Sequence, residues 1–412
     1  MKQLSSCWPV VVLTLLGASL SPGTALASAG PGQACNVQTS TCYASIQSAI
    51  NAAGSGNTID IGVGTYAEHL SISTNLTLQG ATAGSSIVDG SASGSVLTVG
   101  TGATVTIVDV TLRNGSNSFG GGIDNNGTLT LNNDTISGNQ ASDGGGGIYN
   151  AGGSITLNND TLSGNSASTG GGIENDSSGV LKLTNVTISK NTAANASGVY
   201  LNSGKSTIVN TILAGNTTGS SAGCGSGFFI DFGHNVLDTN PNAGSCSSSS
   251  LGNGSNDQEV ANPLVNALAS NGGPTQTMSL QSGSAAISNG LASTCENLPG
   301  GDRDQRGDPR ASRSRNACDI GAFDNGGSPT AGRLVAFTVT RSGHTILFHW
   351  RMAATRGIAG FNLLSGAQRL NRQLIRAHAG RSYRYHTQFA GHGAFRLELV
   401  LTGGTIVVMR PH

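Results

Sequence analysis

The sequence predicts an all-β protein in which a long parallel β-helix is followed by a small β-sandwich. Three observations support this. Gly contributes 62 of the 412 residues, while charged residues make up 10% and aromatic residues 4%, which is unlike a helical globule. A Gly-Gly-Gly-Ile motif ends at Ile123, Ile148 and Ile173, a spacing of 25 residues, and self-similarity of this kind predicts stacked supersecondary units. The last eighty or so residues lose this repeat and become rich in Arg.

Residues 1–27 have the pattern of a signal peptide. Lys2 provides a positive start, an apolar run follows, and Ala25-Leu26-Ala27 forms a small-residue cleavage site. The apolar run is too short to span a bilayer. We therefore expect the mature chain to be secreted and extracellular or to be associated with the cell surface, and no later segment is apolar enough to predict a transmembrane span.

Residues 28–324 are assigned to the β-helix. A short helix over 43–53 is expected to cap the first coil, and the coils run from about Ser45 to Asn289. In a typical unit, Leu181 and Leu183 alternate with polar neighbours, which is the period of a strand, and a Thr-Asn corner follows. Each coil of about 25 residues then contains two or three short strands joined by Asn and Gly corners.

Stacking coils about 4.8 Å apart would place equivalent residues above one another. Leu131, Leu157 and Leu183 are expected inside. The sequence also predicts an asparagine ladder with a left-handed backbone at one corner, because Asn tolerates that conformation and stacked amides can bond along the axis. Its members are Asn139, Asn165, Asn191 and Asn216.

Six cysteines follow the signal peptide, as three local couples: Cys35 with Cys42, Cys224 with Cys246, and Cys295 with Cys318. An even number in an exported chain favours disulfides. Fifteen connectivities are possible, and we expect sequential pairing because each couple lies in one local region.

Several motifs resemble those of a known group of exported bacterial proteins. The opening IQSAIN, the repeated GGGI and SGN segments, the stretch 262–290, DQRGDPR (304–310) and CDIGAFD (318–324) are similar to those of right-handed β-helix proteins called choice-of-anchor Q domain proteins. Their coils resemble polymorphic outer-membrane protein repeats. The resemblance implies a secreted or surface-associated, pectin-lyase-like β-helix with a variable C-terminal anchoring module, and it assigns no reaction.

Residues 325–332 read as a linker, and 333–412 as a basic β-sandwich. Apolar and polar residues alternate in several short stretches, Trp350 and Phe361 are expected core anchors, and Gly403-Gly404 marks a hairpin turn. The pattern resembles fibronectin-III-like modules. From Arg333 onwards there are eleven Arg and a single acid, Glu398, whereas residues 28–290 contain fourteen acids and four cations.

Asp134 and Asp160 are the weak candidates for catalysis. They align one coil apart, where neighbouring coils have Val110 and Val186, and stacking would bring their carboxyls roughly 5 Å apart, near the separation in retaining glycosidases. The alternative is that both bond backbone amides at a corner, where Asp is favoured.

A stripe of acids and tyrosines is the candidate ligand-binding site. Asp124, Tyr149, Glu174 and Tyr200 each follow a buried Ile or Val, so their alternation points them outward. Tyrosine rings can stack on sugars and the acids can bond hydroxyls, whereas the competing interpretation is an ordinary solvated sheet face. We call these four residues the acid–tyrosine stripe.

Other motifs predict no cofactor and no metal site. The Gly runs lack the strand, helix and Lys-Ser/Thr of a phosphate loop. The carboxylates of residues 302–310 lack the spacing of a calcium loop, so internal Asp–Arg pairing is expected. His234 is expected to be a surface or corner residue rather than a catalyst.

The favoured function is a non-catalytic adhesion or carbohydrate-contact module, an adhesin that binds polysaccharide or a cell-wall polymer. A polysaccharide lyase or glycoside hydrolase is the rival interpretation, and a structural spacer is the third. The basic tail would contact an anionic polymer or the acidic coils, or would simply be solvated. Its arginines include Arg341, Arg351, Arg369, Arg372, Arg376, Arg381 and Arg384. We expect a monomer.

Overall fold

The computed structural model describes residues 29–82, 84–176, 178–202, 205–221, 229–238, 256–296, 303–310, 317–325, 334–352, 358–365, 368–376, 382–389, 395–401 and 406–409. The predicted signal peptide, Cys224, Cys246, Gly403-Gly404 and residues 326–332 of the predicted linker lie outside these ranges.

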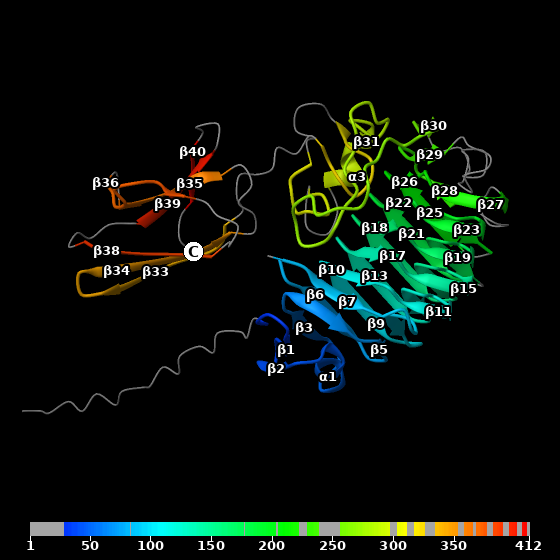
Figure 1. The fold of residues 1–412 in the computed structure, drawn as a ribbon, viewed down its shortest axis with the longest axis horizontal. Coiled ribbons are helices and arrows are strands. Elements are labelled where there is room, and N and C mark those ends of the chain that lie inside the picture. Colours follow the sequence, from blue (N-terminus) through cyan, green and yellow to red (C-terminus); the bar gives the residue numbers. More distant parts are fainter. Residues whose placement is uncertain are drawn as a thin grey trace, which may run out of the picture.

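The predicted parallel β-helix is confirmed, with about seven turns of about 25 residues each. Four sheets run along its axis, and the strands stack in chain order from the blue to the green end (Figure 1). We call the sheets A to D and give the strands of each below. A complete coil passes through them in the order A, B, D, C, as β13, β14, β15 and β16 show.

Sheet A contains β2 (Thr41–Tyr43), β1 (Ala34–Asn36), β3 (Asn57–Ile61), β6 (Leu76–Gly80), β9 (Thr104–Val108), β13 (Thr128–Asn132), β17 (Ser154–Asn158), β21 (Val180–Thr184), β25 (Lys205–Val209) and β28 (Phe229–Asp231). Sheet B contains β4 (Gly64–Ala67), β7 (Ser86–Asp89), β10 (Val110–Arg113), β14 (Thr135–Ser137), β18 (Thr161–Ser163), β22 (Thr187–Ser189), β26 (Ile212–Leu213), β29 (Val236–Asp238) and β30 (Gln258–Val260).

Sheet C contains β5 (Leu70–Ile72), β8 (Leu97–Val99), β12 (Ile123–Asn125), β16 (Ile148–Ala151), β20 (Ile173–Asp176) and β24 (Val199–Leu201). Sheet D contains β11 (Ser116–Phe119), β15 (Gln140–Gly144), β19 (Ser166–Thr169), β23 (Thr192–Asn195) and β27 (Thr217–Ser221).

Inward-facing aliphatic residues stack in register and form the core of the coil region. Leu131 pairs with Leu157, which pairs with Leu183, and all three are buried as expected. The repeat isoleucines at 123, 148 and 173 are aligned in the same way in sheet C and are fully buried. Because each coil covers the apolar interior of the next, the core continues along the axis.

The N-terminal end is capped by a helix, as predicted, although the helix is shorter than expected. Helix α1 (Ile46–Asn51) places Ile46 and Ile50 on the core of the first coil. Ser45 is its N-cap, and the carboxylate of Glu68 accepts hydrogen bonds from the backbone N–H groups of Ile46 and Gln47, both at 2.9 Å. These contacts satisfy exposed donors of the first turn, so the helix begins at Ile46.

The first glycine of each GGGI motif makes the turn between sheets D and C. Gly120, Gly145 and Gly170 have φ between 57° and 67°, and a Cβ on any of them would lie 2.3–2.4 Å from a backbone oxygen three residues later. Neither the conformation nor the space admits a side chain. The repeated glycines are therefore structural corners.

The predicted asparagine ladder is confirmed. The side-chain Nδ2 of Asn139 donates to Oδ1 of Asn165 at 3.0 Å, Asn165 donates to Asn191 at 2.9 Å, and Asn191 donates to Asn216 at 3.0 Å. The expectation of a left-handed backbone at these residues is wrong. The positive φ lies one residue earlier, at Gly138, Gly164, Lys190 and Gly215, because that residue makes the turn and the asparagine then enters extended backbone.

The C-terminal unit consists of two antiparallel sheets that fit a small β-sandwich. One contains β33 (Leu334–Ser342), β34 (Thr345–Met352) and β38 (Ser382–Gln388). The other contains β35 (Ile358–Ser365), β36 (Gln368–Arg369), β37 (Ile375–Arg376), β39 (Phe395–Leu401) and β40 (Ile406–Met409). Trp350 and Phe361 are fully buried core anchors, as predicted, with ring centroids 5.4 Å apart.

Two of the expected disulfides are present, Cys35–Cys42 and Cys295–Cys318. The first joins the antiparallel strands β1 and β2 before the coils. The second joins helix α3 (Ala292–Glu296) to β32 (Ala317–Cys318), which pairs with β31 (Gly290–Leu291). The second lies against the corner residues Asn185 and Asn210 of the later coils.

Candidate functional site

The acid–tyrosine stripe is formed as the repeat predicts. Asp124 pairs in register with Tyr149, Tyr149 with Glu174, and Glu174 with Tyr200, on strands β12, β16, β20 and β24 of sheet C. The neighbouring residues on each strand point into the core, so the four side chains lie on the outer face. The stripe crosses four consecutive coils.

An aromatic pair lies within this surface. The ring of Tyr149 contacts the ring of Phe119 from β11, with centroids 4.7 Å apart and a tilt of 39°. The side chain of Phe119 is 41% exposed, and the hydroxyl of Tyr149 donates to Oδ2 of Asp176 at 2.8 Å. Phe119 and Tyr149 therefore present fixed, partly exposed ring surface beside a carboxylate.

The acids of the stripe are less exposed than the alternation alone indicates. Glu174 is only 7% exposed, because its side chain lies over Gly144 of β15 and accepts a hydrogen bond from the hydroxyl of Thr169 in β19. Asp124 is half-buried and accepts a hydrogen bond from Nδ2 of Asn126 at 3.1 Å. Sheet D thus covers part of the surface that sheet C presents.

Burial and mutual repulsion shift the titration of these groups. Burial raises the pKa of the Glu174 carboxyl, and the nearby charges of Asp176 and Asp143 raise it further. Burial also raises the pKa of Asp124. The pKa of Tyr149 lies above its ordinary range because of burial, its bond to Asp176 and the surrounding carboxylates. The surface favours uncharged or cationic groups over additional anions.

Asp143 and Asp176 belong to the same surface, and the sequence reasoning did not single them out. Both are outside the strict 25-residue column that revealed the stripe, since Asp143 lies in sheet D and Asp176 lies two residues beyond Glu174. Phe119 was missed for the same reason. Only the fold shows that these residues belong to the surface, because it brings the end of each sheet D strand next to the following sheet C strand.

Asp134 and Asp160 are buried structural acceptors. Asp134 accepts hydrogen bonds from the backbone N–H groups of Val110 at 2.7 Å and Asn132 at 2.9 Å. Asp160 accepts from those of Asp134 and Asn158, both at 2.7 Å. Each carboxylate oxygen therefore satisfies one backbone donor, and both side chains are 0% exposed. This is the corner-bonding alternative, and it leaves no oxygen directed towards a substrate.

Burial raises the pKa of both carboxyls well above the usual range, and the carboxylate of Asp160 adds to the rise for Asp134. In a solvent-accessible site such shifts would be a functional signal. Here they arise from desolvation at a corner, where the hydrogen bonds from the backbone act in the opposite direction. The raised pKa values of Asp134 and Asp160 are therefore a result of their structural role and do not indicate a catalytic site.

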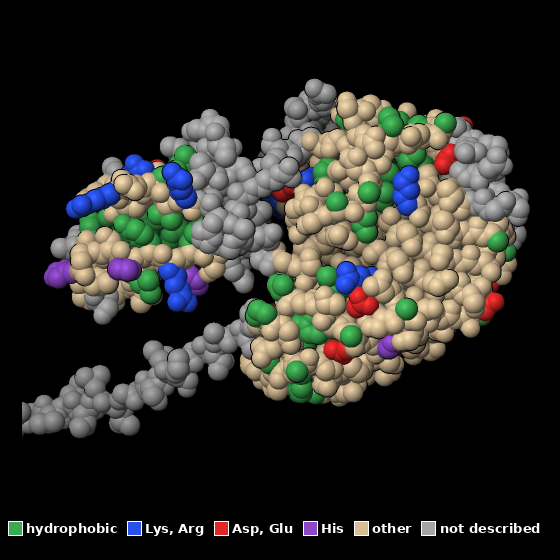
Figure 2. Space-filling model, viewed as in Figure 1, with side chains coloured by type: hydrophobic (Ala, Val, Ile, Leu, Met, Phe, Trp, Pro, Cys, Tyr) green, Lys and Arg blue, Asp and Glu red, His purple; other side chains and the backbone are tan. Residues whose placement is uncertain are grey.

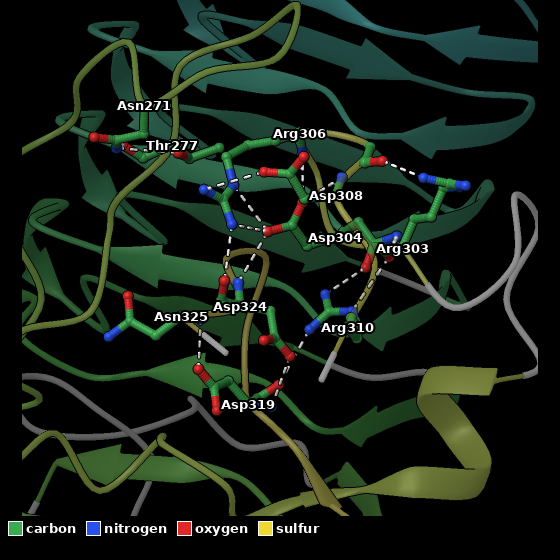
Figure 3. Close-up of polar contacts among 12 residues, drawn as sticks. Asn271, Thr277, Arg303, Asp304, Arg306, Asp308, Arg310, Asp319, Asp324 and Asn325 are labelled. Carbon is green, nitrogen blue, oxygen red and sulfur yellow. Dashed lines mark hydrogen bonds and ion pairs between the residues drawn. The ribbon is translucent and has the colours of Figure 1, made fainter. Parts of the chain in front are cut away.

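The DQRGDPR segment, which we call the closing segment, lies against the side of the coils, and Figure 3 shows the polar contacts around it. Arg306 pairs with Asp304 at 2.6 Å and with Asp308 at 3.4 Å, so the expected internal pairing is confirmed. The guanidinium of Arg306 also lies 3.7 Å from the ring centroid of Phe323. These contacts are internal to the C-terminal part of this region and hold the DQRGDPR segment in a compact conformation.

Gln305 and Arg310 fasten this closing segment to the coils. Nε2 of Gln305 donates to the carbonyl of Asp134 at 2.9 Å, and its Oε1 accepts from the hydroxyl of Thr161. Arg310 is 1% exposed and donates to Oδ1 of Asn159 at 2.7 Å and to the carbonyl of Gly321 at 2.9 Å. The segment therefore covers the outer face of sheet B, and the residues of this motif serve packing.

His234 occupies a corner, as expected. It has a φ of 59°, is half-buried, and its Nδ1 lies 2.7 Å from the carbonyl oxygen of Asn289. It borders an open pocket of about 290 Å³ that is lined otherwise by Asn256, Gln258 and residues 288–292. No carboxylate lines this pocket, so the acid–base partners of a hydrolytic site are not found among its lining residues.

The C-terminal unit presents basic side chains around a hydrophobic patch, while uncharged surface covers most of the visible face of the coils (Figure 2). Arg341, Arg369, Arg372, Arg376 and Arg384 are exposed. Arg381 and the side chain of Arg351 lie outside the described residues. The excess positive charge that the sequence gives to the C-terminal unit therefore lies on side chains that are accessible to solvent.

Within the described residues, no three His, Cys, Asp or Glu side chains are grouped in a way that could hold a metal ion, and no helix is long and apolar enough to cross a membrane.

The fold and the candidate site define an all-β protein with a parallel β-helix and a C-terminal pair of antiparallel sheets. No protein-family model, curated protein sequence or solved structure matches the chain. The resemblances to choice-of-anchor Q domain proteins and to fibronectin-III-like modules therefore stay predictions.

Proposed function

We propose that this protein is a secreted or cell-surface, non-catalytic module that contacts carbohydrate through the acid–tyrosine stripe. The observation that carries the proposal is the partly exposed ring pair of Phe119 and Tyr149, held beside Asp176 in a register that spans several coils. Aromatic faces combined with carboxylate acceptors are suited to the apolar faces and hydroxyl groups of sugars. Repetition along the axis provides an extended surface for a chain-like ligand.

Two further observations support a module of this kind. Disulfides Cys35–Cys42 and Cys295–Cys318 are typical of an oxidising, extracytoplasmic compartment. The rigid coils keep the stripe in a fixed geometry, which reduces the entropy lost on binding.

The rival function, a polysaccharide lyase or glycoside hydrolase, depended on Asp134 and Asp160. Their complete burial and their four backbone hydrogen bonds favour the structural role. On the outer face, the charges of Asp176 and Asp143 both act on the carboxyl of Glu174 and raise its pKa. Any hydrolysis is therefore better sought at the stripe than at the buried pair.

A screen of the purified full-length mature protein against plant and microbial polysaccharides tests the proposal, with binding and newly formed reducing ends measured together. We expect binding without reducing ends, and at least about tenfold weaker binding after Tyr149→Ala/Tyr200→Ala, equivalent to roughly 1.4 kcal/mol. Phe232→Ala is the matched control, since Phe232 is an exposed aromatic residue in another part of the coil region.

Unchanged binding in the double tyrosine variant would remove the stripe from the function. Reducing ends released by the wild-type protein would favour the rival, and hydrolysis that survives Asp134→Asn/Asp160→Asn would exclude the buried pair as its catalyst.

A second role is proposed for the C-terminal unit, which we infer binds an anionic polymer and so attaches the protein. Its support is the set of exposed arginines in a unit whose sequence contains one acid, Glu398. Retention on a polyanion resin should fall steeply with salt, because screening shortens the reach of exposed charges. Retention that ignores salt would contradict this role.

A further inference from the structure

Every charged residue on the strands of sheets C and D is an acid. The four are Asp124 in β12, Asp143 in β15, and Glu174 and Asp176 in β20. None of the eleven strands of these two sheets contains Lys or Arg. The cations of the coils belong to other strands or corners, namely Arg113 in β10, Lys182 in β21, Lys205 in β25 and Lys190 after β22.

These acids form one electrostatic surface. The charges of Asp143 and Asp176 act on Glu174, and those of Asp124, Glu174 and Asp176 act on Tyr149. Asp143 is exposed, and Asp124 and Asp176 are partly exposed, so their carboxylates are accessible from solvent. Adjacent coils are about 4.8 Å apart, which places Asp124 and Glu174 roughly 10 Å apart along the axis.

We propose, on the basis of the proposed function above, that the ligand of this surface is a glycan with amino groups, such as a chain of β-linked glucosamine. Its ring faces would pack on Phe119 and Tyr149, and its ammonium groups would donate charge-assisted hydrogen bonds to the carboxylates. A cation over an aromatic ring is also attracted by the ring's negative face. Polyuronates are disfavoured, because their carboxylates would meet the accessible carboxylates of Asp124, Asp143 and Asp176 and no Lys or Arg on these strands.

Three chemically matched oligosaccharide probes test this inference: a glucosamine hexamer, its fully N-acetylated counterpart, and a galacturonate hexamer. Isothermal titration with the full mature chain at low salt should give at least about tenfold tighter binding of the glucosamine hexamer than of the N-acetylated one, a difference of roughly 1.4 kcal/mol. Added salt should reduce this preference, and the galacturonate hexamer should not bind.

Asp143→Asn is the main variant, because its side chain is exposed and its removal does not open the core. It should weaken binding of the glucosamine hexamer and leave binding of the N-acetylated hexamer unchanged. Glu259→Gln, an exposed acid on β30, is the control and should change neither.

Equal affinity for the glucosamine and N-acetylated hexamers would overturn the amino-glycan inference while leaving carbohydrate contact intact. Preferential binding of the galacturonate hexamer would also overturn it. Failure of all three probes, together with a negative polysaccharide screen, would overturn both this inference and the proposed function.

Discussion

At the scale of single residues, the most unusual side chains in this protein are polar groups that serve the backbone. Asp134 and Asp160 are buried acids, yet each accepts two backbone N–H groups, one of which belongs to the preceding coil. Buried donors without a partner are costly, so these carboxylates hold the corner together. Their raised pKa is the consequence of this placement.

Replacing Asp160 by Ala should therefore destabilise the protein substantially. The variant leaves the N–H groups of Asp134 and Asn158 without their acceptor, and at ~1–3 kcal/mol for each buried group we expect a loss of about 2–6 kcal/mol in the free energy of unfolding. Chemical denaturation followed by circular dichroism measures it. Asp143→Ala, at an exposed position, should change stability by less than about 0.5 kcal/mol, and equal losses in both variants would contradict the account.

The same pair predicts a pH dependence of stability. Because burial raises the pKa of both carboxyls in the folded state, the folded protein binds protons more tightly than the unfolded chain, whose Asp pKa is about 3.9. This contribution is fully present below the unfolded pKa and is lost as pH rises through the folded values. The difference in unfolding free energy between wild type and Asp134→Asn should therefore shift in favour of the variant from pH 4 to pH 7, and a difference that is constant over this range would contradict the assignment.

At the scale of elements, ladders of asparagine define the corners of the coils. One runs from Asn139 to Asn216, and a second links Asn125 to Asn150 at 2.7 Å and Asn150 to Asn175 at 2.6 Å. The first could be predicted because it ends a conserved-looking SGN segment within the chain's own repeat. The second also follows the repeat, since each member lies two residues after the isoleucine of a GGGI motif, but its amides were recognised as a ladder only in the structure.

The closing segment is the element that fastens the chain after the coils to the outer face of sheet B. Arg310→Lys should loosen it, since an ammonium cannot reproduce the several directed donors of the buried guanidinium. Amide hydrogen exchange in residues 303–310 and 317–325 should accelerate at least about tenfold, equivalent to roughly 1.4 kcal/mol. Arg113→Lys, which alters a partly exposed ion pair with Asp89, is the control, and unchanged exchange in the Arg310 variant would show that the segment is held by other contacts.

At the scale of the whole molecule, the 25-residue period was sufficient to predict the coils, the inward leucines and the register of the acid–tyrosine stripe, while the capping helix was predicted from the segment 43–53 before the repeats. Periodicity places residues in columns, and stacking turns columns into neighbours. It does not report which element covers a column from outside, so the burial of Glu174 beneath sheet D and the contact of Phe119 with Tyr149 required the structure. The coil residues that Gln305 and Arg310 contact lie more than 140 residues earlier, and they could not be predicted from the sequence for the same reason.

The central claim is that carbohydrate lies on the acid–tyrosine stripe, and hydroxyl-radical footprinting of the mature protein tests it without any variant. With a polysaccharide that binds the protein, oxidation of Phe119 and Tyr149 should fall, while that of the exposed Phe232, which follows β28 of sheet A, should not change. Protection confined to residues outside sheets C and D, with Phe119 and Tyr149 oxidised as in the free protein, would contradict the claim.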